Sequence, residues 1–276
     1  LVDKDQTDFV TCLNPSGYCA KTNAGPNIVY SGAGTPGETG RVYKGGLLAD
    51  KPEDVAFDSY GNILYTTDDN RIYLRCATTS GWCTAKVVGT VYTLAGGGGG
   101  YADGGLATAT TLNHPTGIAV DSDDNIIFSD TGNNAVRIIC HTNGAATPLN
   151  MCASVIGTDV AAGGVAATPN FIYRVAGGGG GYADGGLATA TTLNSPWGLR
   201  VDSGGNVVVA DSNNYTVRVI CNSVVGLCSG VSGSDISLGS GTAGTFANIY
   251  KLAGVQGSGT FFNGDYSGDG ISALSA

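Results

Sequence analysis

The chain has 276 residues, of which 42% are hydrophobic, 13% are charged and 46 are glycine, and its formal net charge is −9. This size allows one large domain with a core, whereas the acidic balance and the lack of a Lys/Arg cluster argue against nucleic acid or an anionic membrane surface as a partner. The longest apolar runs are too short to cross a bilayer, so we expect no membrane span.

The N-terminal region predicts two strands, at 7–12 and 27–34. The next segment has four apolar runs, at 52–58, 62–67, 71–76 and 91–96, separated mainly by turns rich in Asp, Asn and Gly. Four short strands joined in this way predict an antiparallel meander.

Two further segments repeat this pattern, and each is preceded by the same 19 residues, AGGGGGYADGGLATATTLN, at 95–113 and 176–194. They predict strands at 117–121, 126–130, 135–140 and 171–177, and at 196–202, 206–211, 216–221 and 248–254. A long internal repeat indicates equivalent units that bury surface against one another. The units differ in length mostly after the third strand, so we place that loop at the periphery.

The eight cysteines form four close pairs, and the first member of each pair follows an apolar run. Recurrence at one position predicts four local disulfides, whereas the spacing and the shortage of histidine argue against metal sites. Disulfides imply an oxidising, extracellular or cell-surface location. The predicted pairs are Cys12 with Cys19, Cys76 with Cys83, Cys140 with Cys152 and Cys221 with Cys228.

The repeated motifs are Pro-x-Gly-(Ile/Leu)-x-Val-Asp, then Asp-x-x-Asn, then Val-Arg-(Ile/Val)-(Ile/Val), with a Tyr-x-Asp-Gly-Gly linker. They resemble the NHL repeat in its extracellular form. The resemblance implies a β-propeller, usually of six blades. The first unit departs from it, with Glu53-Asp54 after the proline and Tyr73 in place of Arg137 and Arg218.

We therefore predict an all-β fold, an NHL-type β-propeller segment of four-stranded antiparallel blades in a single domain, 1–276. It comprises a half blade at 1–34, complete blades at 52–96, 115–177 and 196–254, and a linker or tail at 255–276. Three and a half blades fall short of the usual ring. Three explanations stay open: the sequence is part of a longer chain, the ring closes with a two-stranded fourth blade, or neighbouring copies cover the partial edges in a polymer.

No catalytic or metal-binding residue is predicted. His114 and His141 are the only histidines, and the third unit lacks both. Propeller lyases that resemble this chain use several histidines to hold a metal, which this sequence does not supply. The glycine-rich segment at 96–105 lacks the Gly-Lys-Ser/Thr of a phosphate-binding loop, so no cofactor is expected.

The acidic residues that end the first strands, Asp58, Asp121 and Asp202, are expected to form Asx turns, with a calcium site as the alternative. The sequon Asn214-Tyr215-Thr216 predicts an N-glycosylation site at Asn214. Trp197 is the candidate aromatic residue on a ligand-binding face, while Trp82 is expected to cover the backbone of its own disulfide loop.

The sequence thus favours a secreted structural or adhesive module, not an enzyme. We expect it to bind protein, either other copies of itself in a polymer or filament or the rest of a longer chain. A propeller that binds glycans or a small ligand is the alternative, and a lyase or hydrolase is the third hypothesis.

Overall fold

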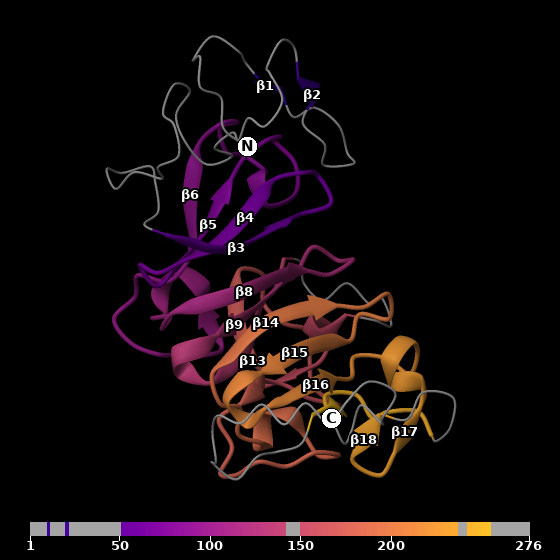
Figure 1. Ribbon diagram of the computed structural model, residues 1–276. Coiled ribbons are helices and arrows are strands. Elements are labelled where there is room, and N and C mark those ends of the chain that lie inside the picture. The colour runs from indigo at the N-terminus through magenta and orange to yellow at the C-terminus, as the bar shows by residue number, and fades with distance from the viewer. Residues whose placement is uncertain (1–9, 12–19, 22–50, 142–149, 237–241, 255–276) are drawn as a thin grey trace.

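The computed structural model describes residues 10–11, 20–21, 51–141, 150–236 and 242–254, and three β-sheets contain most of its strands (Figure 1). The first sheet, blade 1, is an antiparallel meander in the order β3-β4-β5-β6. Its strands are Pro52–Phe57, Ile63–Thr67, Arg71–Arg75 and Val91–Ala95.

Blade 2 contains the same meander, β8-β9-β10-β13, extended beyond its outer strand. The four strands are Pro115–Val120, Ile126–Asp130, Ala135–Ile139 and Phe171–Gly177. A hairpin of β11 (Val155–Ile156) and β12 (Asp159–Val160) adds to β13 by a parallel pairing, and β7 (Gly105–Leu106) pairs with the other end of β13.

Blade 3 repeats this arrangement with β14-β15-β16-β19, at Pro196–Val201, Val207–Asp211, Thr216–Ile220 and Ile249–Ala253. Its hairpin consists of β17 (Val231–Ser232) and β18 (Asp235–Ile236). The sequence predicted plain loops at both places. Gly157 and Gly233 adopt positive φ at the tips of the two hairpins, which lets such short strands turn back.

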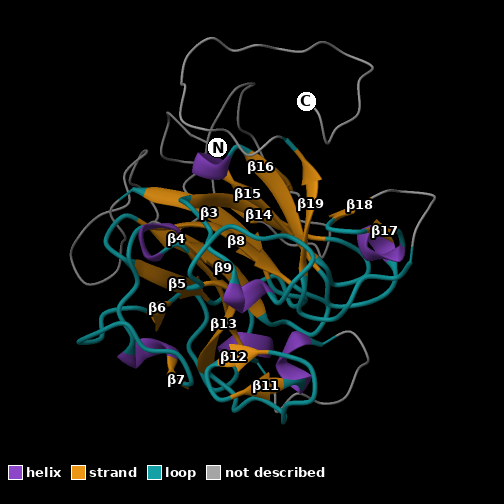
Figure 2. Cartoon of the chain, turned by 90° about the horizontal axis from the view of Figure 1, so that it is seen from below, coloured by secondary structure: helices purple, strands orange, loops and turns teal. Residues whose placement is uncertain are grey.

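The blades pack face to face, and their first strands lie together, with β8 between β3 and β14 (Figure 2). One apolar cluster joins blade 1 to blade 2 and contains Leu64, Ile72 and Phe128; a second joins blade 2 to blade 3 and contains Ile127, Val136 and Leu199. The apolar residues on alternating strand positions therefore form the core between sheets.

Each third strand has a β-bulge against the fourth strand at the same place, between Ile72 and Tyr73, Val136 and Arg137, and Val217 and Arg218. A bulge changes the direction of a side chain locally. The remaining regular elements are 3-10 helices: Gly81–Cys83, Ala107–Ala109, Thr131–Asn133, Met151–Ala153, Ala188–Ala190, Ser212–Asn214 and Gly226–Ser229.

The all-β fold and the three four-stranded antiparallel meanders are confirmed. In the predicted half blade, β1 (Val10–Thr11) pairs with β2 (Ala20–Lys21), while the strand expected at 27–34 and the tail at 255–276 lie outside the described residues. Among the described residues, the structure contains no helix with the length and apolar character of a membrane span.

Candidate functional site

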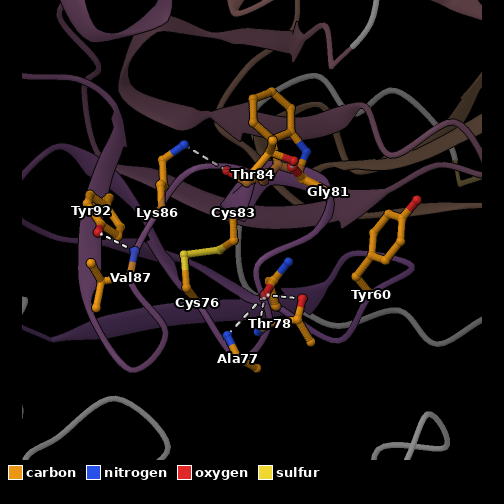
Figure 3. Close-up of a disulfide and its surroundings, with 12 residues drawn as sticks. Tyr60, Cys76, Ala77, Thr78, Gly81, Cys83, Thr84, Lys86, Val87 and Tyr92 are labelled. Carbon is orange, nitrogen blue, oxygen red and sulfur yellow. Dashed lines mark hydrogen bonds between the residues drawn. A yellow bond between two sulfur atoms is a disulfide. The ribbon is translucent and has the colours of Figure 1, made fainter.

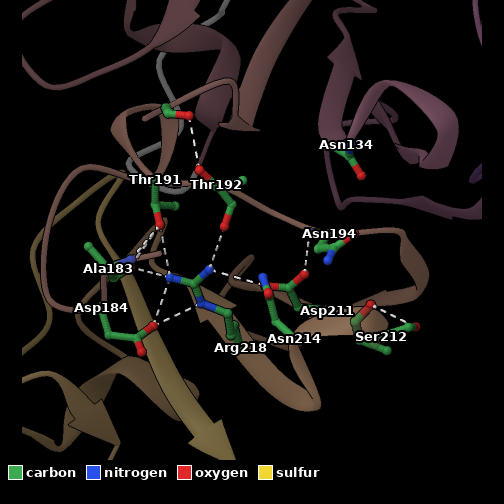
Figure 4. Close-up of polar contacts among 12 residues, drawn as sticks. Asn134, Ala183, Asp184, Thr191, Thr192, Asn194, Asp211, Ser212, Asn214 and Arg218 are labelled. Carbon is green, nitrogen blue, oxygen red and sulfur yellow. Dashed lines mark hydrogen bonds and ion pairs between the residues drawn. The ribbon is translucent and has the colours of Figure 1, made fainter. Parts of the chain in front are cut away.

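Arg218 is completely buried, and residues of the repeated linker surround its guanidinium (Figure 4). Nε lies 2.8 Å from Asp184 Oδ1, and Nη1 lies 3.2 Å from Asp211 Oδ2. Nη2 donates to the carbonyl of Ala183, and the Tyr182 ring lies 4.3 Å from the guanidinium carbon. Burial raises the pKa of Tyr182 to about 12, so this ring stays neutral at ordinary pH.

Blade 2 has the equivalent arrangement around Arg137. Its Nε lies 2.8 Å from Asp103 Oδ1, its Nη1 lies 2.9 Å from Asp130 Oδ2, and the Tyr101 ring lies 4.4 Å away. A buried guanidinium requires partners for its charge and its five donors. The identical linkers therefore surround identical arginines, and their Tyr-Ala-Asp segment supplies the contacts.

Blade 1 has other residues at both positions of the buried arginine–aspartate pair. Tyr73 occupies the position of the arginine and Thr67 that of Asp130. The Tyr73 hydroxyl donates to Asp69 at 2.8 Å, and Tyr73 stacks on Tyr65. In this unit the arginine and its carboxylate partner are therefore replaced together, so neither charge is left buried without the other.

Three of the four predicted cysteine pairs are disulfides in the described residues, with Cα–Cα separations of 5.6, 5.8 and 5.8 Å. Each closes the loop that follows a third strand, and Figure 3 shows the one in blade 1. The three disulfides are Cys76–Cys83, Cys140–Cys152 and Cys221–Cys228.

The fourth predicted pair belongs to the half blade and is not among these disulfides. Cys12 follows β1 directly, and Cys19 directly precedes β2. Both Cys12 and Cys19 lie outside the described residues. The structure therefore supports three of the four predicted disulfides, and the bond between Cys12 and Cys19 stays a prediction.

The carboxylates that end the first strands form Asx turns. Asp121 Oδ1 accepts the amides of Asp123 and Asn125 at 2.9 Å, and Asp58 and Asp202 accept equivalent amides. Within the described ranges, no cluster of His, Cys, Asp or Glu could hold a metal ion.

The equivalent carboxylates differ in acidity. Burial raises the pKa of Asp121 to about 6, in opposition to its hydrogen bonds. At Asp202, burial also acts to raise the pKa, but hydrogen bonds from Asn206, Leu227 and Gly204 outweigh it and lower the pKa. The amide of Leu227 lies 3.0 Å from Asp202 Oδ2, and it comes from the disulfide loop of blade 3.

Both histidines lie against tryptophan rings. The His141 ring is 4.7 Å from Trp82, and the His114 ring is 5.7 Å from Trp197. Trp82 is buried, and its Nε1 donates to the carbonyl of Asp124 in blade 2 at 2.7 Å. The expectation that Trp82 covers the backbone of its own loop stays a prediction, and the structure adds a contact by which this residue joins two blades.

Trp197 is 49% exposed and lines an open cavity of about 470 Å³ beside the first strands. Glu53, Asp54 and Arg200 contribute charged groups to its wall, and Arg200 Nη1 lies 3.2 Å from Asp54 Oδ2. Asp54 also accepts the amide of Ile118 at 3.1 Å. An indole ring beside a charged pair provides both an apolar surface and polar contacts for a small ligand.

On the outer face of blade 1, Tyr65 is buried, but the first strand is exposed at a position that is buried in the first strands of the other blades. Val55 is 54% exposed, whereas the equivalent Ile118 and Leu199 are 1% and 2% exposed. Phe57, two residues along the same strand, is 52% exposed. We call the surface formed by Val55 and Phe57 the head face.

Blade 3 presents the opposite side of the repeat. Val208 and Val217 are half-buried, whereas their equivalents in blade 2, Ile127 and Val136, are buried between blades. Leu252 on β19 is half-buried beside them. We call the surface formed by Val208, Val217 and Leu252 the tail face.

Asn214 lies at the end of a 3-10 turn, and its Nδ2 donates to Asp211 Oδ2 at 2.8 Å. The equivalent Asn133 makes the same contact with Asp130 at 2.9 Å, although it belongs to no sequon. The amide therefore has a structural contact in the Arg218 network, and glycosylation at Asn214 stays a prediction.

The family model of the NHL repeat matches residues 112–139 and 193–220. The chain thus contains two segments that are similar to the NHL repeat. Each match ends with the third strand of its blade, so it includes the bulge and the buried arginine. The predicted resemblance is confirmed for blades 2 and 3, and with it the propeller-type fold.

The chain is also similar to several solved structures, at low identity and partial coverage. A structural genomics protein of unknown function from Bacteroides thetaiotaomicron shares 15% identity, with a TM-score of 0.39 and coverage of 71% of this chain and 41% of that one. Virginiamycin B lyase from Staphylococcus aureus shares 11% identity, with a TM-score of 0.33 and coverage of 80% of this chain and 54% of that one. A chain of a nidogen/laminin complex shares 16% identity, with a TM-score of 0.30 and coverage of 67% of this chain and 64% of that one. The chain thus spans between 41% and 64% of the length of these structures. No curated protein sequence matches it.

The sequence did not reveal that the NHL arginines are buried and paired. A signal was available in the repeat itself. The Tyr-Ala-Asp linker and the aspartate at the end of the second strand both accompany Arg137 and Arg218, and both are missing in the unit that has Tyr73. Residues that are replaced together within a chain are candidates for contact.

Proposed function

We propose that the chain is an extracellular structural or adhesive module that binds protein through its two terminal blade faces. The observation that carries this proposal is the contrast between Val55, which is 54% exposed, and its buried equivalents Ile118 and Leu199. An apolar side chain that is buried in two of three equivalent units is suited to burial in the third. Protein binding at this face requires no catalytic group.

An extracellular location is supported by the three disulfides, which persist in oxidising compartments. The proposal includes no enzymatic activity. The two histidines lie against tryptophan rings, and the carboxylates at the strand ends accept local amides, so these groups already have structural contacts.

Oxidative footprinting tests the proposal. Hydroxyl radicals are applied to two samples of the chain. In one the chain remains bound in the extracellular material from which it is isolated, and in the other it has been separated from that material and is free in solution. We expect Phe57 and Leu252 to be oxidised only in the dispersed chain, because a bound protein covers both faces in the native material. Tyr60 is 51% exposed outside these faces and serves as the control, with equal oxidation in both samples. Equal oxidation of Phe57 in both samples contradicts the proposal.

A second candidate function is the binding of a glycan or small ligand in the cavity beside Trp197, favoured by the exposure of this indole next to Arg200. Titration with an oligosaccharide panel, followed by tryptophan fluorescence, tests it. A ligand in this cavity changes the emission of the native chain but not that of the Trp197→Phe variant, in which only the buried Trp82 remains. An unchanged emission with every sugar contradicts this second function.

A further inference from the structure

The head face and the tail face are the two halves of an interface that the chain already forms twice. Between blades 1 and 2, Leu64 and Ile72 of one sheet pack against Ile118 and Phe128 of the next. Between blades 2 and 3, Ile127 and Val136 take the place of Leu64 and Ile72. The repeat therefore defines which side of one blade fits which side of the following blade.

The two terminal faces carry apolar side chains in the same register as the interior faces. Val55 of the head face occupies the position of Ile118, and Val208 and Val217 of the tail face occupy those of Ile127 and Val136. All of these residues are apolar. The head face differs at one position, where Tyr65 stands in place of Phe128 and Val209 and is 2% exposed. A head face and a tail face brought together would otherwise repeat the apolar packing of the interior junctions.

The first strand of blade 3 also has the space that a following blade needs. A Cβ atom added at Gly117 of blade 2 would lie 2.5 Å from the carbonyl oxygen of Trp197, because the two strands approach closely. The equivalent glycine of blade 3, Gly198, has no atom within 4 Å of such a Cβ. The side of β14 that would receive another first strand is therefore open.

We propose that the tail face of one copy binds the head face of a second copy of this chain, so that blade 1 of the second copy continues the stack after blade 3 of the first. This inference rests on the proposed function and names its partner. The contact is heterologous, because each copy offers a different face, and such contacts generate a closed ring or an open filament according to the rotation between copies.

One polar contact distinguishes this junction from the interior ones. At the two interior junctions, the side-chain oxygen of Asn70 accepts the amide of His114 at 2.6 Å, and that of Asn134 accepts the amide of Ser195 at 2.8 Å. In blade 3 the equivalent residue is Tyr215. The contact between copies lacks this amide acceptor, so we expect it to be weaker than the interior junctions and to depend on concentration.

The test uses two variants of the full oxidised chain, each with one face blocked by a charge. Phe57→Asp blocks the head face and Val217→Asp blocks the tail face, because burying an unpaired carboxylate is unfavourable. Sedimentation velocity should show species larger than a monomer for the native chain and only monomers for each variant. An equal mixture of the two should form a dimer of one copy of each, since one variant retains the tail face and the other the head face.

Val165→Asp is the control, because Val165 is 72% exposed and belongs to neither face; it should assemble as the native chain does. Circular dichroism and a thiol assay confirm that each variant is folded and oxidised. If a variant fails to fold, the native chain alone decides, since assembly must increase with its concentration.

A native chain that stays monomeric at every concentration overturns the proposal, and points to a segment of the same chain as the occupant of these faces. Assembly that both variants retain, or a mixture that gives no dimer, overturns it too. If the footprint of Phe57 in native material is nevertheless protected, a different protein covers the head face, and the proposed function stands while this inference fails. If the footprint shows no protection, the proposed function itself fails.

Discussion

Arg137 and Asp130 form an ion pair with both side chains completely buried, in which Nη1 lies 2.9 Å from Oδ2. The two residues are on adjacent strands, β10 and β9, and Asp103 of the repeated linker contacts the same guanidinium. The pair therefore connects the linker to the middle of blade 2.

We expect Asp130→Ala to lower the free energy of unfolding by about 3–5 kcal/mol, because it leaves a buried guanidinium with incomplete charge compensation. Arg200→Ala is the control: the Arg200 side chain is 71% exposed, so loss of its pair with Asp54 should cost under about 1 kcal/mol. Denaturant unfolding measures both. Equal losses of stability in the two variants would show that the buried ion pair contributes no more than the exposed one.

Blade 1 supplies a replacement for this pair. The double variant Asp130→Thr, Arg137→Tyr copies Thr67 and Tyr73, and we expect its loss of stability to be smaller than the sum of the two single losses. A double-mutant cycle of unfolding free energies measures the coupling. Additive losses would mean that the exchange in blade 1 is not a coupled one.

The pKa contrast between Asp121 and Asp202 predicts opposite effects of acid. The pKa of Asp121 is raised to about 6 in the folded chain, so the stability it contributes is present below about pH 4 and is lost as the pH rises through about 6. The pKa of Asp202 is lowered, so its contribution is present above about pH 4 and is lost as the pH falls.

Carbon-13 NMR titration of the aspartate carboxyl groups checks the two pKa values directly. In unfolding experiments between about pH 3 and 7, the difference between the native chain and Asp121→Asn should decline with increasing pH, whereas the difference from Asp202→Asn should grow. Parallel curves for the two variants would contradict the assignment.

Equivalent glycines should respond differently to a methyl group. Gly117→Ala places a Cβ 2.5 Å from a backbone oxygen, so β8 and β14 must separate, and we expect a loss of about 1–3 kcal/mol. Gly198→Ala has open space and should change stability by less than about 0.5 kcal/mol in the dispersed chain. Thermal or denaturant unfolding compares them, and a larger loss for Gly198→Ala would disprove the argument.

Removal of a disulfide should destabilise the chain through the loop it closes. In the chain-entropy account, loops with separations of 7 and 12 residues contribute roughly 2–3 kcal/mol each. Under oxidising conditions, we expect the double variant Cys221→Ser, Cys228→Ser to have a free energy of unfolding lower than that of the native chain by that amount. Addition of a reductant should lower the free energy of unfolding of this variant by less than that of the native chain, because the variant has one disulfide fewer to lose. An unchanged unfolding midpoint for the reduced native chain would contradict this expectation.

The strands of the three meanders were predictable, because their alternating apolar residues and Asp/Asn/Gly turns are local signals. The hairpins β11–β12 and β17–β18 were not, since each strand has two residues and depends on a neighbour distant in sequence; Asp159 pairs with Arg174 across such a contact. The role of Trp82 was likewise hidden, because its partner Asp124 belongs to the next blade. Sequence shows what a unit forms, but the contacts between units depend on how they stack.

The identical linkers have a consequence for the folding pathway. The linker that contains Asp103 can in principle enclose Arg218 as well as Arg137, since both arginines have the same surroundings. Its native partner lies 34 residues away, whereas Arg218 is more than three times as distant along the chain. Loop-closure entropy then favours the native choice by about 1 kcal/mol. Because this free-energy difference is small, we expect misfolding in which a linker packs on the arginine of the wrong blade. At high concentration, the same exchange can occur between two molecules.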